Sequence, residues 1–122
     1  MPILDVQVIG SVPEEIRRGL AQRIADEVGR VFESGSQETW VTLHFIPADA
    51  YSENSGGPPA GVQPVIVSVI QTRPPRGQAL REQVARLTRV IADACRRPAE
   101  NVHLIYEPAA KGGVAFGGNI VE

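Results

Sequence analysis

The sequence predicts an α+β protein in which two tandem strand–helix–strand units form one four-stranded mixed sheet with two helices on one face. One observation is a repeat: the apolar pattern of the first half recurs 62 to 64 positions later, and Pro2 recurs as Pro64. Another is that each half begins and ends with a run of β-branched and aromatic residues, which favour strands. We expect a single domain over 1–122, with a first unit at 1–47, a connecting loop at 48–62 and a second unit at 63–122.

The first unit starts with a predicted strand at 3–9, in which alternation is only partial. Ser11-Val12-Pro13-Glu14 has the pattern of a capping box with proline in the first turn, which predicts one amphipathic helix ending near 34–36. The apolar positions of this helix recur at helical spacing, at Ile16, Leu20, Ile24, Val28 and Val31. A second strand is predicted at 39–46.

The polar segment 47–61 is rich in glycine, proline and serine, and it predicts a long connection that is either a linker or a lid. After it we predict a strand at 63–70, a helix at 78–97 and a strand at 101–107. The inward positions of the helix are Leu80, Val84, Leu87, Ile91 and Cys95. Each unit then pairs its two strands in parallel through a right-handed helical crossover.

Two helices cover only one face of such a sheet, so we expect the other face to be apolar and uncovered. The apolar strand residues are too numerous to point all toward two helices; they include Trp40, Leu43, Phe45, Val67, Val69, Leu104 and Tyr106. An uncovered apolar face of this size predicts self-association with closed symmetry.

Composition and charge disfavour several classes of function. The net charge of −2 argues against general nucleic-acid binding, but its placement, −5 over 1–62 and +3 over 63–122, makes the second half able to receive an anion. The longest apolar stretch is too short to span a bilayer, and the single cysteine, Cys95, forms no intrachain disulfide. We expect a cytoplasmic protein without a membrane or nucleic-acid partner. No set of histidine, cysteine and acidic residues has metal-ligand spacing, so we predict no metal.

The start of the chain carries the main chemical signal. Removal of Met1 would expose the secondary amine of Pro2, and an α-amino group titrates at about 7.7 to 8.0, so it can act as a base or a nucleophile near neutral pH. The alternative is that Pro2 only occupies the first position of a strand, where no N–H donor is needed. If Met1 stays attached, the Pro2 nitrogen is an amide and cannot titrate.

The tail of the chain has two glycine pairs, Gly112-Gly113 and Gly117-Gly118, on either side of Val114-Ala115-Phe116. This pattern predicts a small hairpin with left-handed turn residues. A phosphate-binding loop is disfavoured, because the Gly-x-Gly-x-x-Gly spacing and a following helix are both absent from the sequence.

These residues together carry a resemblance to a known family. The second half, from Arg73 to Lys111-Gly112 and Gly117-Gly118, is similar to a whole subunit of the 4-oxalocrotonate tautomerase family, and Met1-Pro2-Ile3 matches that family's catalytic terminus. The chain therefore resembles a fused, double-length member of the tautomerase superfamily. The same arrangement is seen in macrophage migration inhibitory factor, cis-3-chloroacrylic acid dehalogenase and malonate semialdehyde decarboxylase. The resemblance covers nearly the entire chain and implies a homotrimer whose sheets form a barrel-like core.

The resemblance also implies roles for individual residues. Pro2 matches the general base, or the acid once protonated, of a cofactor-independent enzyme that interconverts enol and keto forms of a small 2-oxo or unsaturated carboxylic acid. Arg73 matches the arginine that grips a substrate carboxylate, and Arg76 lies close to the second arginine of the decarboxylase and dehalogenase branches. Phe116 falls near the hydrophobic residue that lines the family's pocket.

The first unit departs from the family pattern. Ser11-Val12 stands where the single-length family has an arginine after its first strand. The position of the other pocket arginine, early in the second strand, holds Trp40 or Val41 in the first unit and His103 in the second. Only the second unit keeps arginine chemistry, so we expect three sites per trimer, each using Pro2.

Several further side chains have two interpretations. Tyr106 and Trp40 belong either to a core or interface, or to the wall of a substrate pocket. His44 and His103 are either structural or water-activating, and Glu107 is either a surface carboxylate or a group that orients a water. With a water activator, the same fold would support a hydratase, dehalogenase or decarboxylase of a three-carbon acid. If the first residue is retained, a non-catalytic trimeric binding protein is the alternative.

Overall fold

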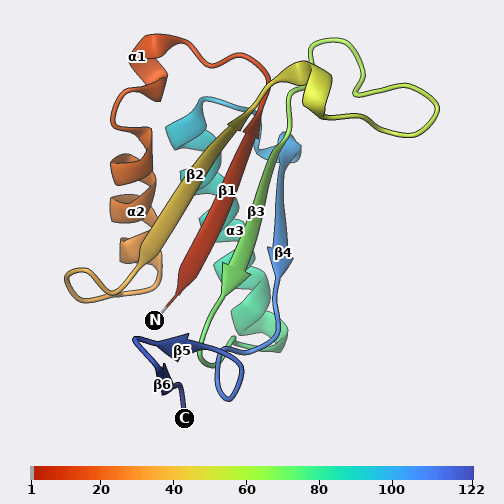
Figure 1. Ribbon diagram of the computed structural model, residues 1–122. Helices are drawn as coiled ribbons and strands as arrows, with labels where there is room; N and C mark the ends of the chain where they lie inside the picture. The colour runs from red at the N-terminus through yellow and green to blue at the C-terminus, as the bar shows by residue number, and fades with distance from the viewer. Residues whose placement is uncertain (1) are drawn as a thin grey trace.

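The computed structural model describes residues 2–122, which form a four-stranded sheet with helices on one face and a small hairpin at one end (Figure 1). The strands of the sheet lie in the order β2-β1-β3-β4. Their bounds are Ile3–Ile9 for β1, Trp40–Ile46 for β2, Val65–Ile70 for β3 and Val102–Tyr106 for β4. The predicted α+β architecture is confirmed. Met1, whose removal the prediction for Pro2 requires, lies outside the described residues.

The pairing of the strands confirms the repeated unit. β1 pairs in parallel with β2, and β3 pairs in parallel with β4, while an antiparallel seam between β1 and β3 joins the units. Ile3 faces Trp40 in the first unit and Val65 faces Val102 in the second, so partners are 37 positions apart in both. Apart from Ile9, the buried residues of β1 fall on even numbers and those of β3 on odd numbers, so an odd offset, 61, sets their inward-facing residues against one another. The offset of 62 that sets Pro2 against Pro64 holds for the starts of the strands, whereas the inward-facing residues correspond at 61.

The core lies between the sheet and the two long helices, α2 (Leu20–Val31) and α3 (Gly77–Cys95). The central strands direct alternate side chains toward the helices, and the innermost are Leu4, Val6, Val8, Val65, Val67 and Val69. The helices contribute Leu20, Ile24, Val28, Val31, Leu87, Ile91, Ala92 and Cys95. Each large apolar side chain buried in this way stabilises the fold by roughly 1.5–3 kcal/mol. The core therefore fixes the position of the strand ends.

The helical segment of the first unit is interrupted, whereas the sequence predicts one continuous helix. α1 spans only Glu14–Arg17, and Gly19 takes a left-handed conformation (φ 69°) before α2 begins. The predicted capping box is also wrong, because Pro13 is the N-cap and no side chain caps α1. A residue in the left-handed region ends the regular hydrogen bonding of a helix, and glycine adopts this conformation without a steric penalty.

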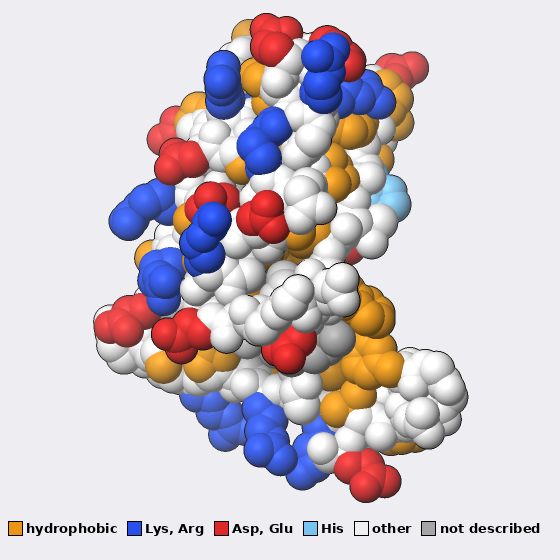
Figure 2. Space-filling view, turned by 90° about the vertical axis from the view of Figure 1, so that its left-hand side faces the viewer, with side chains coloured by type: hydrophobic (Ala, Val, Ile, Leu, Met, Phe, Trp, Pro, Cys, Tyr) orange, Lys and Arg blue, Asp and Glu red, His pale blue; other side chains and the backbone are white. Residues whose placement is uncertain are grey.

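The sheet face that points away from the helices is apolar in part, but through other residues than those considered from the sequence. Of the seven side chains considered for it, only that of Trp40 lies there; Leu43, Phe45, Val67, Val69, Leu104 and Tyr106 pack on the helix side. On the open face the polar Asp5 and His44 alternate with isoleucines, of which Ile105 is half exposed; the others are Ile3, Ile66 and Ile70. Along the right-hand edge of Figure 2, where this face is seen side-on, hydrophobic side chains alternate with polar ones.

Two short 3-10 helices and a hairpin complete the chain. η1 (Ala48–Ala50) lies in the long connection before β3, and η2 (Ala99–Asn101) precedes β4. The predicted tail hairpin is confirmed as β5 (Ala115–Phe116) and β6 (Asn119–Ile120), with both residues of its turn at positive φ. Within residues 2–122, no helix combines the length and the apolar character needed to cross a membrane.

Candidate functional site

The candidate site lies at the end of the sheet where β1 and β2 begin and where β3 and β4 end, next to the hairpin (Figure 1). Pro2 is buried directly before β1, and its carbonyl accepts the backbone N–H of Trp40 at 3.1 Å. Because β1 has a neighbouring strand on both sides, Pro2 lies in the middle of this end of the sheet.

Gln71 is the cross-strand neighbour of Pro2, and the sequence analysis missed it. The seam between β1 and β3 ends with Ile3 opposite Ile70, so one further step sets Pro2 opposite Gln71. The Gln71 carbonyl accepts the N–H of Ala110 at 2.8 Å, whereas its side-chain Oε1 is buried without a hydrogen-bond partner among the described residues. An unsatisfied buried acceptor costs roughly 1–3 kcal/mol, so this oxygen marks a place that suits a donor. Only the strand register identifies it, and the sequence contains no signal of it.

Two arginines follow β3 at the same end. Arg73 and Arg76 are exposed, and no carboxylate within residues 2–122 lies at ion-pair distance from either of them. Arg76 is the N-cap of α3 and makes no side-chain capping hydrogen bond. A helix start with free N–H groups carries partial positive charge, to which the guanidinium groups add. This end of the sheet therefore favours an anion, as the charge of the second half predicts.

Trp40 and Phe116 come together at this end. Their rings meet edge to face, with 5.3 Å between the centroids, and the Trp40 Nε1 donates to the carbonyl of Gln37 at 3.0 Å. The contact joins the β5–β6 hairpin to the start of β2, the strand bonded to Pro2. The pair forms an apolar surface at the start of β2.

Tyr106 is the last residue of β4, and Glu107 follows it at the same end of the sheet as Pro2. The Tyr106 side chain points toward the helices, its hydroxyl lies 2.5 Å from Gln83 Oε1, and burial raises its pKa to about 12. Glu107 is half-buried, and its backbone N–H donates to Val69 at 2.9 Å. Tyr106 is therefore part of the core, whereas Glu107 lies beyond the strand end.

The two histidines lie away from this end. His44 Nε2 lies 2.7 Å from Asp5 Oδ1 on the open face, which is an ion pair when the imidazole is protonated. His44 follows Trp40 by four residues along β2, about 13 Å at strand spacing. His103 is exposed near the start of β4, at the opposite end of the sheet. Neither imidazole is adjacent to Pro2.

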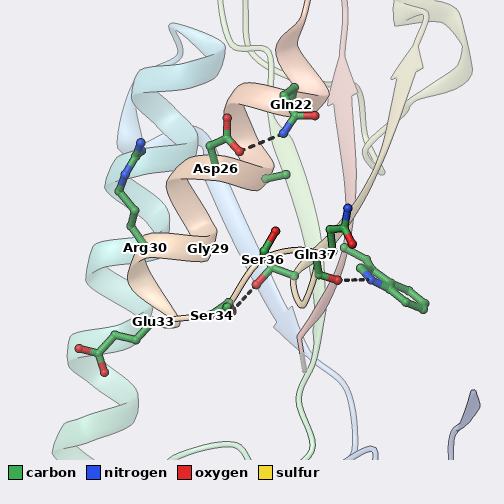
Figure 3. A pocket seen from close by; sticks show the side chains of 12 residues that line it. Gln22, Asp26, Gly29, Arg30, Glu33, Ser34, Ser36 and Gln37 are labelled. Atoms are coloured by element: carbon green, nitrogen blue, oxygen red, sulfur yellow. Dashed lines mark hydrogen bonds between the residues drawn. The ribbon is translucent and has the colours of Figure 1, made fainter.

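A polar hollow of about 570 Å³ opens between α2 and the loop that leads to β2 (Figure 3). Trp40 lines it, and Ser34 and Thr39 share a hydrogen bond of 2.5 Å in its wall. The charged residues of the lining are Asp26, Arg30 and Glu33. Pro2 is not among the lining residues, so the hollow borders the candidate site without containing it.

The opposite end of the sheet has equivalent positions, but a side chain fills it. At the offset of 61, Pro2 corresponds to Gln63 and Gly10 corresponds to Gln71. A Cβ atom placed on Gly10 would lie 2.6 Å from Gln63 Nε2, and Gly10 has a φ of +88°. The two ends are thus equivalent in topology and different in content, because Gln63 stands in the register where Pro2 stands at the other end, and Pro64 follows it.

Comparison with known proteins identifies the fold. No protein-family model matches the chain, and no curated protein sequence matches it. The crystal structure of Pt0534 inactivated by 2-oxo-3-pentynoate is similar, with a TM-score of 0.75 and 16% identity over 98% of this chain and 95% of that one. The asymmetric trimer of the F6 fused 4-OT gives 0.75 and 16% over 97% and 94%. The macrophage migration inhibitory factor homologue from Prochlorococcus marinus gives 0.71 and 13% over 98% and 99%. At these identities the likeness establishes a shared fold over nearly the whole chain.

Proposed function

We propose that this chain, which has the fold of the tautomerase superfamily, is a cofactor-independent tautomerase that interconverts the enol and keto forms of a small 2-oxo or unsaturated carboxylic acid. The observation that carries the proposal is the place of Pro2, buried at the start of a central strand. Arg73 and Arg76 follow β3 at the same sheet end, without a carboxylate partner among residues 2–122. Once Met1 is removed, this edge combines a secondary amine with a cationic surface.

The chemistry follows from these groups. The neutral Pro2 amine takes a proton from the carbon next to the substrate carbonyl and returns it to the other end of the enolate. Nearby positive charge favours the neutral amine, because it disfavours a second cation. Arg73 and Arg76 hold the carboxylate and stabilise the enolate oxygen. Trp40 and Phe116 provide the apolar wall for the rest of the substrate.

The proposal includes a homotrimer. The F6, Q0 and W0 fused 4-OT structures, which share this fold, are trimers. On this chain the open face of the sheet carries the half-exposed Ile105, and it is the face that a second copy would cover. Sedimentation or light scattering measures this assembly directly.

The decisive experiment starts from protein whose intact mass shows that the chain begins at Pro2. Conversion of the enol of phenylpyruvate to its keto form is then measured for Pro2→Ala, Arg73→Leu and the matched control Arg89→Leu, which alters an exposed arginine on α3. We expect Pro2→Ala, which keeps a primary amine, to lose orders of magnitude in turnover, and Arg73→Leu to raise KM. Arg89→Leu should match the parent. Unchanged turnover in Pro2→Ala refutes the proposal, and native protein that retains Met1 favours the non-catalytic binding protein instead.

A second reaction has one observation in its favour, the half-buried carboxylate of Glu107 at the same end of the sheet. A carboxylate in that place can take a proton from water while a protonated Pro2 acts as the acid. The reaction would then be hydration, dehalogenation or decarboxylation of a three-carbon acid. Incubation with malonate semialdehyde and 3-haloacrylates, followed by product analysis, distinguishes the reactions. Glu107→Gln should abolish any such product while leaving enol–keto conversion intact.

A further inference from the structure

We propose that Gln71 is a positioning residue for Pro2: its side-chain oxygen accepts one N–H of the protonated amine and thereby directs the other N–H toward the substrate. The inference rests on the proposed use of Pro2 as an acid and base. It concerns a residue to which neither the sequence analysis nor the proposed mechanism assigns a role.

The strand register places Pro2 and Gln71 as close as an antiparallel pair allows. Ile9 donates its N–H to the carbonyl of Pro64 at 3.1 Å, which makes Ile9 and Pro64 a hydrogen-bonded pair. Pair types alternate along the seam, so Pro2 and Gln71, seven steps away, fall on the non-hydrogen-bonded type. In that type the Cα atoms are about 4.5 Å apart and the two side chains share one face of the sheet.

The equivalent pair at the other end of the sheet shows what a glutamine does in this position. Gly10 and Gln63 are also a non-hydrogen-bonded pair, and the Gln63 side chain lies across its partner. Its Cγ, Cδ and Nε2 atoms are 3.1, 2.8 and 2.6 Å from the place of a Cβ on Gly10. A glutamine side chain in this pair therefore reaches directly over the residue opposite. At the site end, the residue opposite the glutamine is Pro2.

The backbone of Gln71 is held in place, and its side-chain oxygen lacks a donor among the described residues. Its backbone carbonyl is taken by Ala110, which is itself buried, so the residue is fixed at the end of β3. Its Oε1 is buried and has no hydrogen-bond partner within residues 2–122. A protonated secondary amine has two N–H donors, and hydrogen bonds from a charged donor are roughly twice as strong as neutral ones. One donor satisfies Oε1, and the other remains for the substrate carbon.

The test is a pH titration of the Pro2 amine, monitored by the ¹⁵N NMR signal of this residue. The protein is labelled with ¹⁵N-proline, and its mass shows that the chain begins at Pro2. Gln71→Leu removes the acceptor at similar volume, and Gln71→Met does so at similar length in case the leucine variant fails to fold. We expect the amine to titrate about 0.5 to 1 pH unit lower in either variant, since one unit corresponds to about 1.4 kcal/mol. Gln71→Glu should move the titration upward. Gln78→Leu, an exposed glutamine at the start of α3, is the matched control and should leave it unchanged.

Every outcome of the titration bears on the inference. An unchanged midpoint in the Gln71 variants overturns it. An upward shift in Gln71→Leu also overturns it, because the amide would then be donating to the neutral amine. The measurement needs no turnover, so a normal response without enol–keto conversion defeats the proposed activity and leaves the role of Gln71 standing. If parent and variant both turn over substrate and their amines titrate identically, the role of Gln71 is refuted and the proposed activity stands. Native protein that keeps Met1 overturns both proposals.

Discussion

Arg97 Nη1 donates to the carbonyl of Ile9 at 2.9 Å, although the two residues are 88 positions apart in the sequence. The same nitrogen lies 2.8 Å from the carbonyl of Gln63, and Nη2 lies 3.3 Å from that of Ser11. Partial burial lowers the pKa of the guanidinium, although an arginine side chain stays protonated in proteins. One side chain thus joins the end of β1 to the chain just before β3, where the two units meet.

Loss of this guanidinium should destabilise the fold. Arg97→Leu leaves three carbonyls without their donor, and Arg97→Lys replaces a planar fork by a point donor that cannot reach all three. We expect a loss of about 2–4 kcal/mol for leucine and less for lysine, measured by urea unfolding. Arg89→Leu on the exposed side of α3 serves as the control and should stay within about 0.5 kcal/mol of the parent. Equal stability of Arg97→Leu and Arg89→Leu would contradict the prediction.

Two glycines should respond to alanine in opposite directions. Gly10→Ala places a Cβ 2.6 Å from Gln63 Nε2 at a φ of +88°, and we expect it to cost about 1–3 kcal/mol. Gly29 lies in α2 with ordinary helical geometry and no atom within 4 Å of its Cβ position, so Gly29→Ala should stabilise by about 0.5–1 kcal/mol. Thermal unfolding of both variants tests the pair. The added substitution Gln63→Ala should recover only the steric part of the Gly10→Ala loss.

Cys95 should make the fold sensitive to alkali. Burial raises the pKa of its thiol to about 11, whereas an unfolded cysteine titrates near 8.5. Between these values the folded state keeps a proton that the unfolded state has lost, so stability falls as pH rises through this window. Urea unfolding at intervals from pH 8 to 11 should show this fall, and Cys95→Ala should flatten it whatever its effect at pH 8. Tyr106→Phe should act only at the upper end, between about 10 and 12. An equally steep fall in Cys95→Ala would refute the assignment.

The contact between Trp40 and Phe116 should hold the tail hairpin in place. An edge-to-face pair contributes about 0.5–1.5 kcal/mol beyond the area it buries. Trp40→Ala should therefore speed trypsin cleavage after the exposed Lys111, which lies just before the hairpin. Trp40→Phe, which keeps an aromatic ring, should be cleaved at nearly the parent rate. Identical cleavage rates for all three proteins would show that the hairpin is held by other contacts.

A charge at Ile105 should disturb the assembly. This side chain is 50% exposed on the open face of the sheet, so Ile105→Asp adds little strain within one chain. In a trimer that covers this face, it buries an unpaired carboxylate. We expect light scattering to show a smaller species for Ile105→Asp and the parental mass for Arg89→Asp. An unchanged mass for Ile105→Asp would place the interface elsewhere.

The architecture was predictable from the sequence because its determinants are local. Strand runs with β-branched residues and helices with a repeated apolar stripe define both units, and their parallel pairing follows from the length of the crossover. The interruption before α2 was not predictable from periodicity, since Leu20 continues the apolar spacing of Ile16. The interruption is caused by the left-handed conformation of Gly19. A single glycine does not disturb the apolar spacing, so the sequence pattern does not reveal this conformation.

The candidate site was predictable only in part. The family resemblance implies four of its residues, namely Pro2, Arg73, Arg76 and Phe116. In the structure, the segments that carry them lie at the same end of the sheet. The identification of Gln71 depends on which residue of β3 faces Pro2, and this register is set by contacts between strand residues 57 to 67 positions apart. The same register, invisible in the sequence, decides which strand residues face the helices and which face outward.

The antiparallel seam also sets the order in which the molecule is completed. β1 leaves the ribosome first, yet its second neighbour, β3, begins only at Val65. Until then the first unit presents an unpaired strand edge, the feature by which nascent sheets aggregate or pair with a copy of themselves. Because Val6 and Val67 lie opposite each other and also correspond at the offset of 61, β3 presents to β1 nearly what a second β1 would present. Covalent linkage of the halves thus supplies, within one chain, a partner that a half-length chain would have to find by collision.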